Sequence, residues 1–192
     1  MAVMILGLIL FLGIHSVRLV SDSARDHWMN RLGEGPWKGL YTVISLVGFV
    51  LIIWGYGLAR QNMVWLWVPP VALAHIAALL MLFSFIFLVA AFVPGTHIKA
   101  RLGHPMVLGV KVWALAHVLS NGTLADVILF GSFLVWSVAI YAKARRRDRA
   151  NGVTYKAISA QRDAIAVVIG LVAWGVFALF LHGWLIGVKP FG

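Results

Sequence analysis

One apolar stretch of the chain, residues 103–122, carries polar side chains whose spacing suits chemistry within a helix. His117 lies four positions after Trp113 and four before Asn121, so we expect the three side chains on one helix face. A neutral imidazole is a common metal ligand, and polar groups at bilayer depth are rare and mark functional sites. We therefore predict His117 as a metal or cofactor ligand and Asn121 as its catalytic neighbour. The alternative is a buried core imidazole, with Asn121 simply ending the helix.

His104 and Lys111 lie earlier in the same stretch. His104 is 13 residues from His117, which on a straight helix separates them by about 20 Å along the axis. The two histidines therefore need different partners, and His104 belongs near the membrane surface. Lys111 either extends toward that surface or pairs with a carboxylate or propionate group.

Two further histidines, His15 and His182, lie in other apolar runs. His15 is either an axial metal ligand or a buried imidazole bonded to a neighbouring helix. His182 precedes Gly183 and Trp184 near the predicted membrane surface, where interfacial hydrogen bonding is the simpler interpretation.

These residues must be positioned by membrane-spanning helices. Of the 192 residues, 62% are hydrophobic and 11% charged, whereas soluble domains are about half apolar and about a quarter charged. A helix needs about 20 apolar residues to cross a bilayer. The candidate runs are residues 2–20, 39–59, 68–93, 105–121, 124–142 and 164–188. We expect an all-α polytopic membrane bundle of about six transmembrane helices, with residues 1–192 forming a single domain.

Basic residues decide the predicted orientation. The loops on one side hold 13 Lys and Arg, and those on the other side hold 2. Positive loops face the cytoplasm, which places both termini on the outer side. Topology thereby explains the net charge of +10, and nucleic acid is not an expected partner. Asp148 and Asp163 lie in the most basic loop and are expected to pair locally.

The chain has no cysteine. This excludes disulfides, iron–sulfur clusters, thiolate-ligated haem and cysteine nucleophiles. Histidine, with 7 residues, is the main soft ligand that remains.

Several motifs together point to a known family. They are His15-Ser16, His104-Pro105, Trp113-Ala114-Leu115-Ala116-His117, Asn121-Gly122, Tyr155 with Ser159, and the ending at residues 182–190. On these motifs, the chain resembles over nearly its whole length the NnrU family of bacterial membrane proteins, which is related to the plant zeta-carotene isomerase. The His-Pro and Trp-x-Leu-Ala-His elements are the more specific ones.

The resemblance implies a protein that carries haem b, with His15 and His117 as axial iron ligands. In the related isomerase, ferrous haem isomerises the central double bond of a polyene in a redox-gated step. The bacterial family is associated with denitrification and nitric oxide metabolism. Around such a haem, the expected cofactor-binding residues are His104, Lys111, Trp113, Arg18, Arg101 and His182, with the basic ones facing the propionates.

The same resemblance implies a multi-pass protein of the bacterial inner (cytoplasmic) membrane, in which the charge distribution makes both termini periplasmic. It would contact membrane lipid and act on an apolar polyene or a small nitrogen-oxide substrate, as a monomer or a homo-oligomer. One difficulty concerns depth, because His15 lies inside the midplane and His117 outside it. By depth alone, His75 or His182 is the better mate for His117, and His182 stays a reserve ligand.

The chain departs from the family pattern at two positions. Ala114 stands where the isomerase has a cysteine implicated in ligand exchange, so that exchange has no counterpart here. Gly103 stands where an arginine usually precedes the His-Pro pair, although Arg101 is near.

Two other functions remain open. One is a membrane methyltransferase of the isoprenylcysteine carboxyl type, suggested by His104-Pro105, Gly109 and Tyr155. Such enzymes carry glutamates in a later motif, whereas the single glutamate of this chain is Glu34. The other is a non-enzymatic membrane protein for assembly, sensing or electron transfer, with or without haem.

Overall fold

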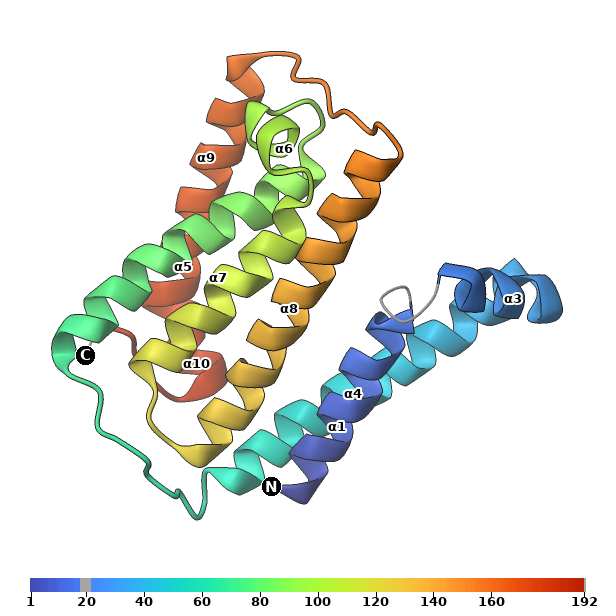
Figure 1. The fold of residues 1–192 in the computed structure, drawn as a ribbon. Helices are drawn as coiled ribbons and strands as arrows, with labels where there is room; N and C mark the ends of the chain where they lie inside the picture. The colour runs from blue at the N-terminus through green and yellow to red at the C-terminus, as the bar shows by residue number, and fades with distance from the viewer. Residues whose placement is uncertain (18–21, 192) are drawn as a thin grey trace.

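The computed structural model describes residues 1–17 and 22–191, which are largely helical (Figure 1). The helices are α1 (Ala2–His15), α3 (Asp22–Leu32), α4 (Glu34–Ala59), α5 (Val71–Phe92), α6 (His97–Leu102), α7 (Pro105–Ser120), α8 (Leu124–Ala150), α9 (Ala160–Val176), the π-helix η1 (Phe177–Leu181) and α10 (His182–Ile186). Within the described ranges the extended segments form no strand, only one isolated bridge between Trp65 and Thr123. The prediction of an all-α protein is confirmed.

Four helical segments are long and apolar enough to cross a membrane: α4, α5, α8 and the continuous run Ala160–Ile186. α1 and α7 are apolar but have only 14 and 16 residues. At 1.5 Å per residue they extend about 21 and 24 Å, less than the roughly 30 Å of a bilayer core. Four of the six expected spans are therefore confirmed as long apolar helices, whereas the helices in the positions of the first and fourth are too short to qualify.

The predicted boundaries are close for α5 and α7, but α4 and α8 extend beyond their apolar runs. α4 begins at Glu34, directly after Gly33, whose φ of 86° is incompatible with continuing α3. α8 continues past residue 142 to Ala150 because its last turns are mainly Ala, Lys and Arg, which are strong helix formers. Hydropathy marks the part of a helix that suits lipid, and not the end of the helix.

The helices form two groups. α1 packs along α4, while α7 packs against both α5 and α8, and α9 packs against α5. Figure 1 shows the α1–α4 pair diverging from α8 toward the C-terminal end of α1. The two groups meet near the N-terminus of α1, where α1, α4 and α8 share one core. That core consists of Met4, Leu8, Ile52, Ala59, Ala125, Leu129 and Phe130.

Glycines allow α1 and α4 to pack closely. A Cβ on Gly7 would lie 2.6 Å from the backbone nitrogen of Ile52, and a Cβ on Gly55 would collide with the backbone of Met4. Small residues at such contacts are typical of membrane helices, where close van der Waals packing drives association.

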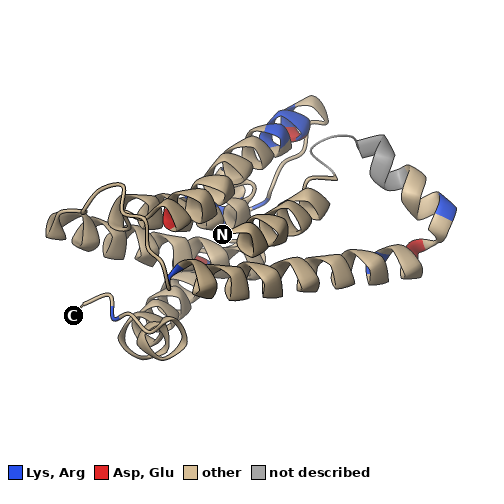
Figure 2. Cartoon of the chain, turned by 90° about the horizontal axis from the view of Figure 1, so that it is seen from below, with Lys and Arg blue, Asp and Glu red and all other residues tan. Residues whose placement is uncertain are grey.

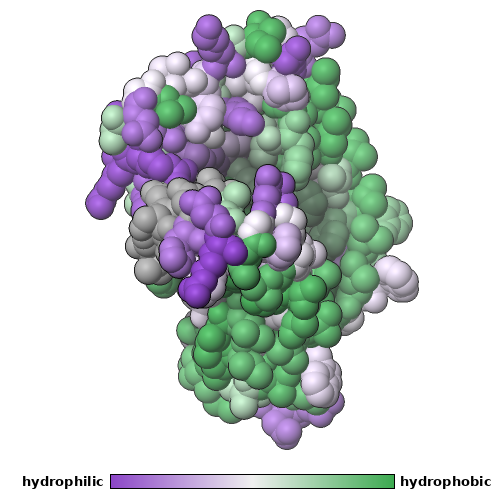
Figure 3. All heavy atoms as spheres, turned by 90° about the vertical axis from the view of Figure 1, so that its right-hand side faces the viewer, coloured by the Kyte–Doolittle hydropathy of each residue, from purple (hydrophilic) through white to green (hydrophobic). Residues whose placement is uncertain are grey.

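The surface has the polarity of a membrane protein. Figure 3 shows one face on which hydrophobic side chains form a broad area beneath a polar end. Lys and Arg gather at the C-terminal end of α8, where Arg145, Arg146, Arg147 and Arg149 follow one another closely (Figure 2). Apolar helix faces of this kind contact membrane lipid.

Candidate functional site

His15 is the last residue of α1 and is held by its own helix. Its Nδ1 lies 2.6 Å from the carbonyl oxygen of Phe11. A carbonyl only accepts, so Nδ1–H is the donor and Nε2 is the basic nitrogen. The ring of Phe11 stacks on the imidazole with centroids 4.3 Å apart. Among the described residues Nε2 has no hydrogen-bond partner, which leaves it available to a ligand.

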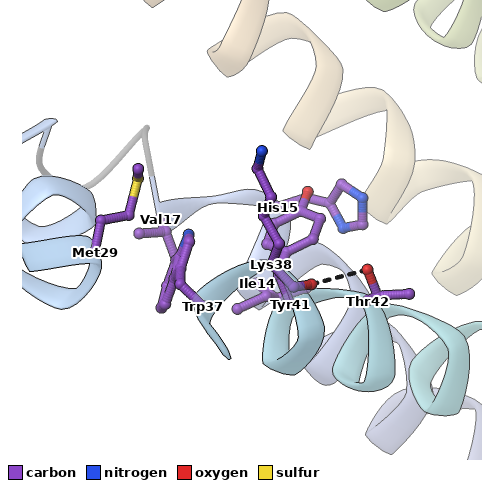
Figure 4. A pocket seen from close by; sticks show the side chains of 8 residues that line it. All are labelled: Ile14, His15, Val17, Met29, Trp37, Lys38, Tyr41 and Thr42. Carbon is purple, nitrogen blue, oxygen red and sulfur yellow. Dashed lines mark hydrogen bonds between the residues drawn. The ribbon is translucent and has the colours of Figure 1, made fainter. Parts of the chain in front are cut away.

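A cavity of about 420 Å³ adjoins His15 (Figure 4). It lies where α1, α3 and the start of α4 meet. Its lining is mostly apolar or aromatic, with a few polar groups: Ile14, His15, Val17, Met29, Trp37, Lys38, Tyr41 and Thr42. The Lys38 ammonium is largely exposed and pairs with Glu34 at 2.6 Å. A mainly apolar cavity with few polar groups is the usual form of a cofactor or small-molecule site.

His117, in α7, repeats the arrangement of His15. Its Nδ1 lies 2.9 Å from the carbonyl oxygen of Trp113, so Nδ1–H donates and Nε2 is again the basic nitrogen. Its ring stacks on Phe130 of α8 at 4.5 Å and lies 5.4 Å from the indole of Trp113. Trp113 and His117 therefore share a helix face, as the four-residue spacing predicts. In the part of the chain that the structure describes, Nε2 has no hydrogen-bond partner.

One face of α8 connects the two histidines. Phe130 stacks on His117, whereas Trp136 meets His15 edge-on at 6.3 Å. Between them Phe133 contacts Trp113 at 5.3 Å and Phe11 at 5.9 Å. Phe130 and Trp136 are six residues apart, which is about 9 Å along a helix. The two imidazoles thus lie at different levels of one aromatic surface and do not face each other, consistent with the depth difficulty seen in the sequence.

The indole N–H of Trp136 is another available group on this surface. It is buried and has no hydrogen-bond partner among the described residues. Buried donors are almost always paired in folded proteins. Trp136 therefore offers a donor beside His15 to any ligand that brings an acceptor.

A buried carboxylate lies one turn from Phe130, and sequence analysis overlooked it. Asp126 accepts hydrogen bonds from the Tyr56 hydroxyl at 2.5 Å and from the Thr123 hydroxyl at 2.6 Å. Thr123 also donates its backbone N–H and, in return, accepts from the N–H of Asp126, which completes a capping box at the start of α8. The pattern Thr-x-x-Asp at the start of the predicted span 124–142 was the available signal. The Tyr56 bond links α4 to α8 across 70 residues.

His182 lies on the His117 side of the molecule, at the start of α10. Its Nδ1–H donates to the carbonyl of Val188 at 2.6 Å. The role of His182 as a reserve ligand for His117 stays a prediction.

The remaining predicted residues are dispersed. Asn121 caps α7, and its backbone N–H donates to the carbonyl of His117 at 3.0 Å. Lys111 places its Nζ 6.0 Å from the centre of the Tyr141 ring, a cation–π contact that the sequence did not predict. Arg101 is exposed at the end of α6, far along α7 from His117. Arg18 lies outside the described residues.

His104 belongs to a separate polar cluster at the arginine-rich end. Its Nε2 lies 2.8 Å from the buried carboxylate of Asp148, to which the Tyr155 hydroxyl donates at 3.1 Å. Burial raises the pKa of Tyr155, and the hydrogen bond to Asp148 raises it further. Asp148 was expected to pair with a nearby basic residue. Its contact with Arg145 is long, at 3.9 Å, and its shorter bonds go to His104 and Tyr155.

The expected local pairing is wrong for Asp163. Its carboxylate accepts from the ring Nδ1 of His97 at 2.6 Å and from the backbone N–H groups of His97 and Ile98 at 3.1 and 3.0 Å. These N–H groups open α6, and unpaired donors at a helix start attract a carboxylate. The nearby arginines in the sequence suggested a local partner for Asp163, but its actual partner, His97, lies 66 residues away.

Two observations bear on the alternative chemistries. Within residues 1–17 and 22–191, no group of three or more His, Asp or Glu is arranged to hold a metal ion. Gly109, which the methyltransferase interpretation placed with His104 and Tyr155, is instead buried against α5, where its carbonyl accepts from Ser84 at 2.8 Å.

Comparison with known proteins identifies the family. No curated protein and no solved structure matches this chain. The family model described as NnrU protein matches residues 3–190, which is almost the entire sequence. The motifs around His15, His104, His117 and His182 all fall within the match. The chain therefore belongs to the NnrU family.

Proposed function

We propose that this chain is a haem-b-binding membrane protein with two candidate iron ligands, His15 and His117. Because the two imidazoles do not face each other in this arrangement, each is proposed as a ligand in its own right and not as half of an axial pair. The observation that carries the proposal is that the two imidazoles have the same hydrogen-bonding arrangement. In each, Nδ1–H donates to the carbonyl four residues earlier, and Nε2 has no partner among the described residues. Iron-ligating histidines are commonly oriented by a hydrogen bond at the second ring nitrogen, so both side chains have the required form.

The surroundings of His15 also fit a large, mainly apolar cofactor. The cavity beside it has an apolar and aromatic lining, and Lys38, which pairs with Glu34, supplies a cation near its edge. Bound haem would supply one-electron redox chemistry and a coordination position for a substrate or small molecule. We assign His15 as the primary ligand, because His15 lines the cavity and His117 does not.

His117 is the second ligand candidate, at the other end of the aromatic surface. Phe130, Phe133 and Trp136 line the side of α8 between the two histidines. His182 is the alternative on the His117 side, because its Nδ1 is likewise engaged by a carbonyl.

The proposed reaction class rests on the family resemblance and on the residue at position 114. Ala114 is completely buried and replaces the cysteine of the related isomerase, so an isomerase mechanism that exchanges a thiolate for histidine is not proposed. A redox reaction of a small nitrogen oxide fits the association of the family with denitrification. A polyene isomerisation that proceeds without a thiolate is the second candidate. The proposed location is the bacterial inner membrane, with both termini periplasmic.

An optical spectrum tests haem binding directly. The full-length protein, purified in detergent, should show a Soret band that shifts on reduction with dithionite and a pyridine haemochrome typical of haem b. Purified protein that lacks a Soret band even after reconstitution with haemin contradicts the proposal.

Variants then test the ligands. His15→Ala is expected to reduce the haem content severalfold, and His117→Ala to change the spectrum or reduce the haem content. His97→Ala provides a matched control, because the His97 ring pairs with Asp163 and His97 is not among the candidate ligands. If His15→Ala and His117→Ala both retain the wild-type spectrum and haem content, the ligand assignment is wrong.

Carbon monoxide distinguishes a reactive haem from a carrier of electrons. A change in the spectrum of the reduced protein on adding carbon monoxide indicates an open or displaceable position, which nitrogen-oxide chemistry requires. A reduced protein inert to carbon monoxide favours the non-enzymatic function instead.

The methyltransferase function has one supporting observation, since the rings of His104 and Tyr155 lie 5.9 Å apart and share Asp148. Calorimetric titration with S-adenosylmethionine tests it, and absence of binding removes it.

A further inference from the structure

The connection between α4 and α5 presents a row of exposed apolar side chains. Residues 61–70, which we call the 61–70 strap, contain no charged residue. Met63, Val64, Trp65 and Leu66 are each more than half exposed, and Val68 is 81% exposed. A continuous apolar surface of this kind is not stable in water and marks an interface.

The strap is extended, but the turn between α7 and α8 holds its backbone. The N–H groups of Leu66 and Trp67 donate to the carbonyl of Gly122 at 2.8 and 3.2 Å, and the N–H of Leu124 donates to the carbonyl of Val64 at 2.8 Å. Gly122 makes this approach possible, because a Cβ there would collide with the carbonyl of Trp67. The strap is thus a defined surface and not merely a loose loop.

The backbone of the strap suits an apolar environment. Non-helical backbone at membrane depth is tolerated where its polar groups are paired within the protein. The bonds to residues 122–124 pair part of the strap, and Pro69 and Pro70 have no N–H to leave unpaired. Trp65 and Trp67 are of the residue type that is enriched at the boundary between headgroups and acyl chains.

We propose that the 61–70 strap is embedded in the lipid interface at the end of the bundle opposite the arginine-rich end. The strap is continuous with the lipid-facing surfaces of two spans: Trp54 of α4 is 59% exposed before it, and Val71 of α5 is 75% exposed after it. The partner is the lipid itself, through acyl and glycerol groups, because the strap offers no charge to select an anionic headgroup.

Insertion of the strap has a consequence for the candidate site. The residues that it binds, 122–124, directly follow the helix that carries His117 and precede Asp126. An embedded strap therefore fixes the depth of the His117 end of the bundle and covers that end from the aqueous side.

The absence of cysteine makes a direct test feasible. Val68→Cys and Val153→Cys are each labelled with a nitroxide in the full-length protein, reconstituted into phosphatidylcholine vesicles. Val153 is a matched exposed valine, in the loop between α8 and α9. The label at residue 68 should collide severalfold more often with oxygen than with a water-soluble nickel chelate, and the label at residue 153 should show the reverse.

Two outcomes would overturn the proposal. A label at residue 68 that is as accessible to the nickel chelate as the label at residue 153 places the strap in water. A label that neither reagent reaches, with dipolar broadening between labels, places a second copy of the chain on the strap. Neither measurement requires bound haem. In an independent readout, lipids brominated near the carbonyl should quench wild-type tryptophan fluorescence more than that of the Trp65→Phe, Trp67→Phe double variant.

Discussion

At the scale of single residues, three histidines share one arrangement. His15, His117 and His182 each donate Nδ1–H to a main-chain carbonyl, at 2.6, 2.9 and 2.6 Å. The backbone thereby selects one tautomer and directs the basic nitrogen, Nε2, away from the donating helix or turn. A sequence identifies the histidines, but the tautomer depends on which carbonyl the ring reaches.

The buried hydrogen bond between Tyr56 and Asp126 gives a residue-level prediction. Tyr56→Phe removes the polar connection between α4 and α8 and leaves Asp126 with one donor fewer. The free energy of unfolding in detergent should fall by about 1–3 kcal/mol, the usual range for a buried partner lost. Ser45→Ala is the control, because its hydroxyl bonds only to its own helix. Equal effects of the two variants would contradict the assigned role.

At the scale of helices, the contact between α1 and α4 depends on glycine. Gly55→Leu should separate the helices, because Cβ of any side chain would collide with the backbone of Met4. We expect destabilisation of about 1–3 kcal/mol, typical of an overpacked contact, measured by thermal unfolding in detergent. Gly57→Leu is the matched control on the same helix, since no atom lies within 4 Å of a Cβ there. It should leave the midpoint unchanged or raise it.

The helices also show what a sequence predicts and what it leaves undetermined. Among the described residues, hydropathy located the four long and two shorter apolar helical segments, and four-residue spacing placed Trp113 and His117 on one face. Both signals are local. The bonds from Tyr56 to Asp126 and from His104 to Asp148 join residues 70 and 44 positions apart. Such partners depend on how helices pack, which a single sequence does not specify. The cavity at His15 escaped prediction for the same reason.

At the scale of the whole molecule, the distribution of Lys and Arg predicts which side of the membrane each loop faces. The arginine-rich end of α8 should face the cytoplasm and both termini the opposite side, because positive loops are retained inside. Alkaline phosphatase fused after residue 192 should be active in cells, and the same enzyme inserted after Gly152 should be inactive. Green fluorescent protein at the same positions should give the opposite pattern. Activity after Gly152 would reverse the orientation.

The indole N–H of Trp136 is buried and has no partner among the described residues, so it should lower folding stability while favouring ligand binding. A buried donor without a partner costs about 1–3 kcal/mol, so Trp136→Phe should stabilise the ligand-free protein. The same change removes a donor beside His15, so any ligand that accepts from the indole should bind more weakly. Opposite signs for melting temperature and affinity would mark Trp136 as a residue retained for recognition at the expense of stability. A loss of both would make it an ordinary packing residue.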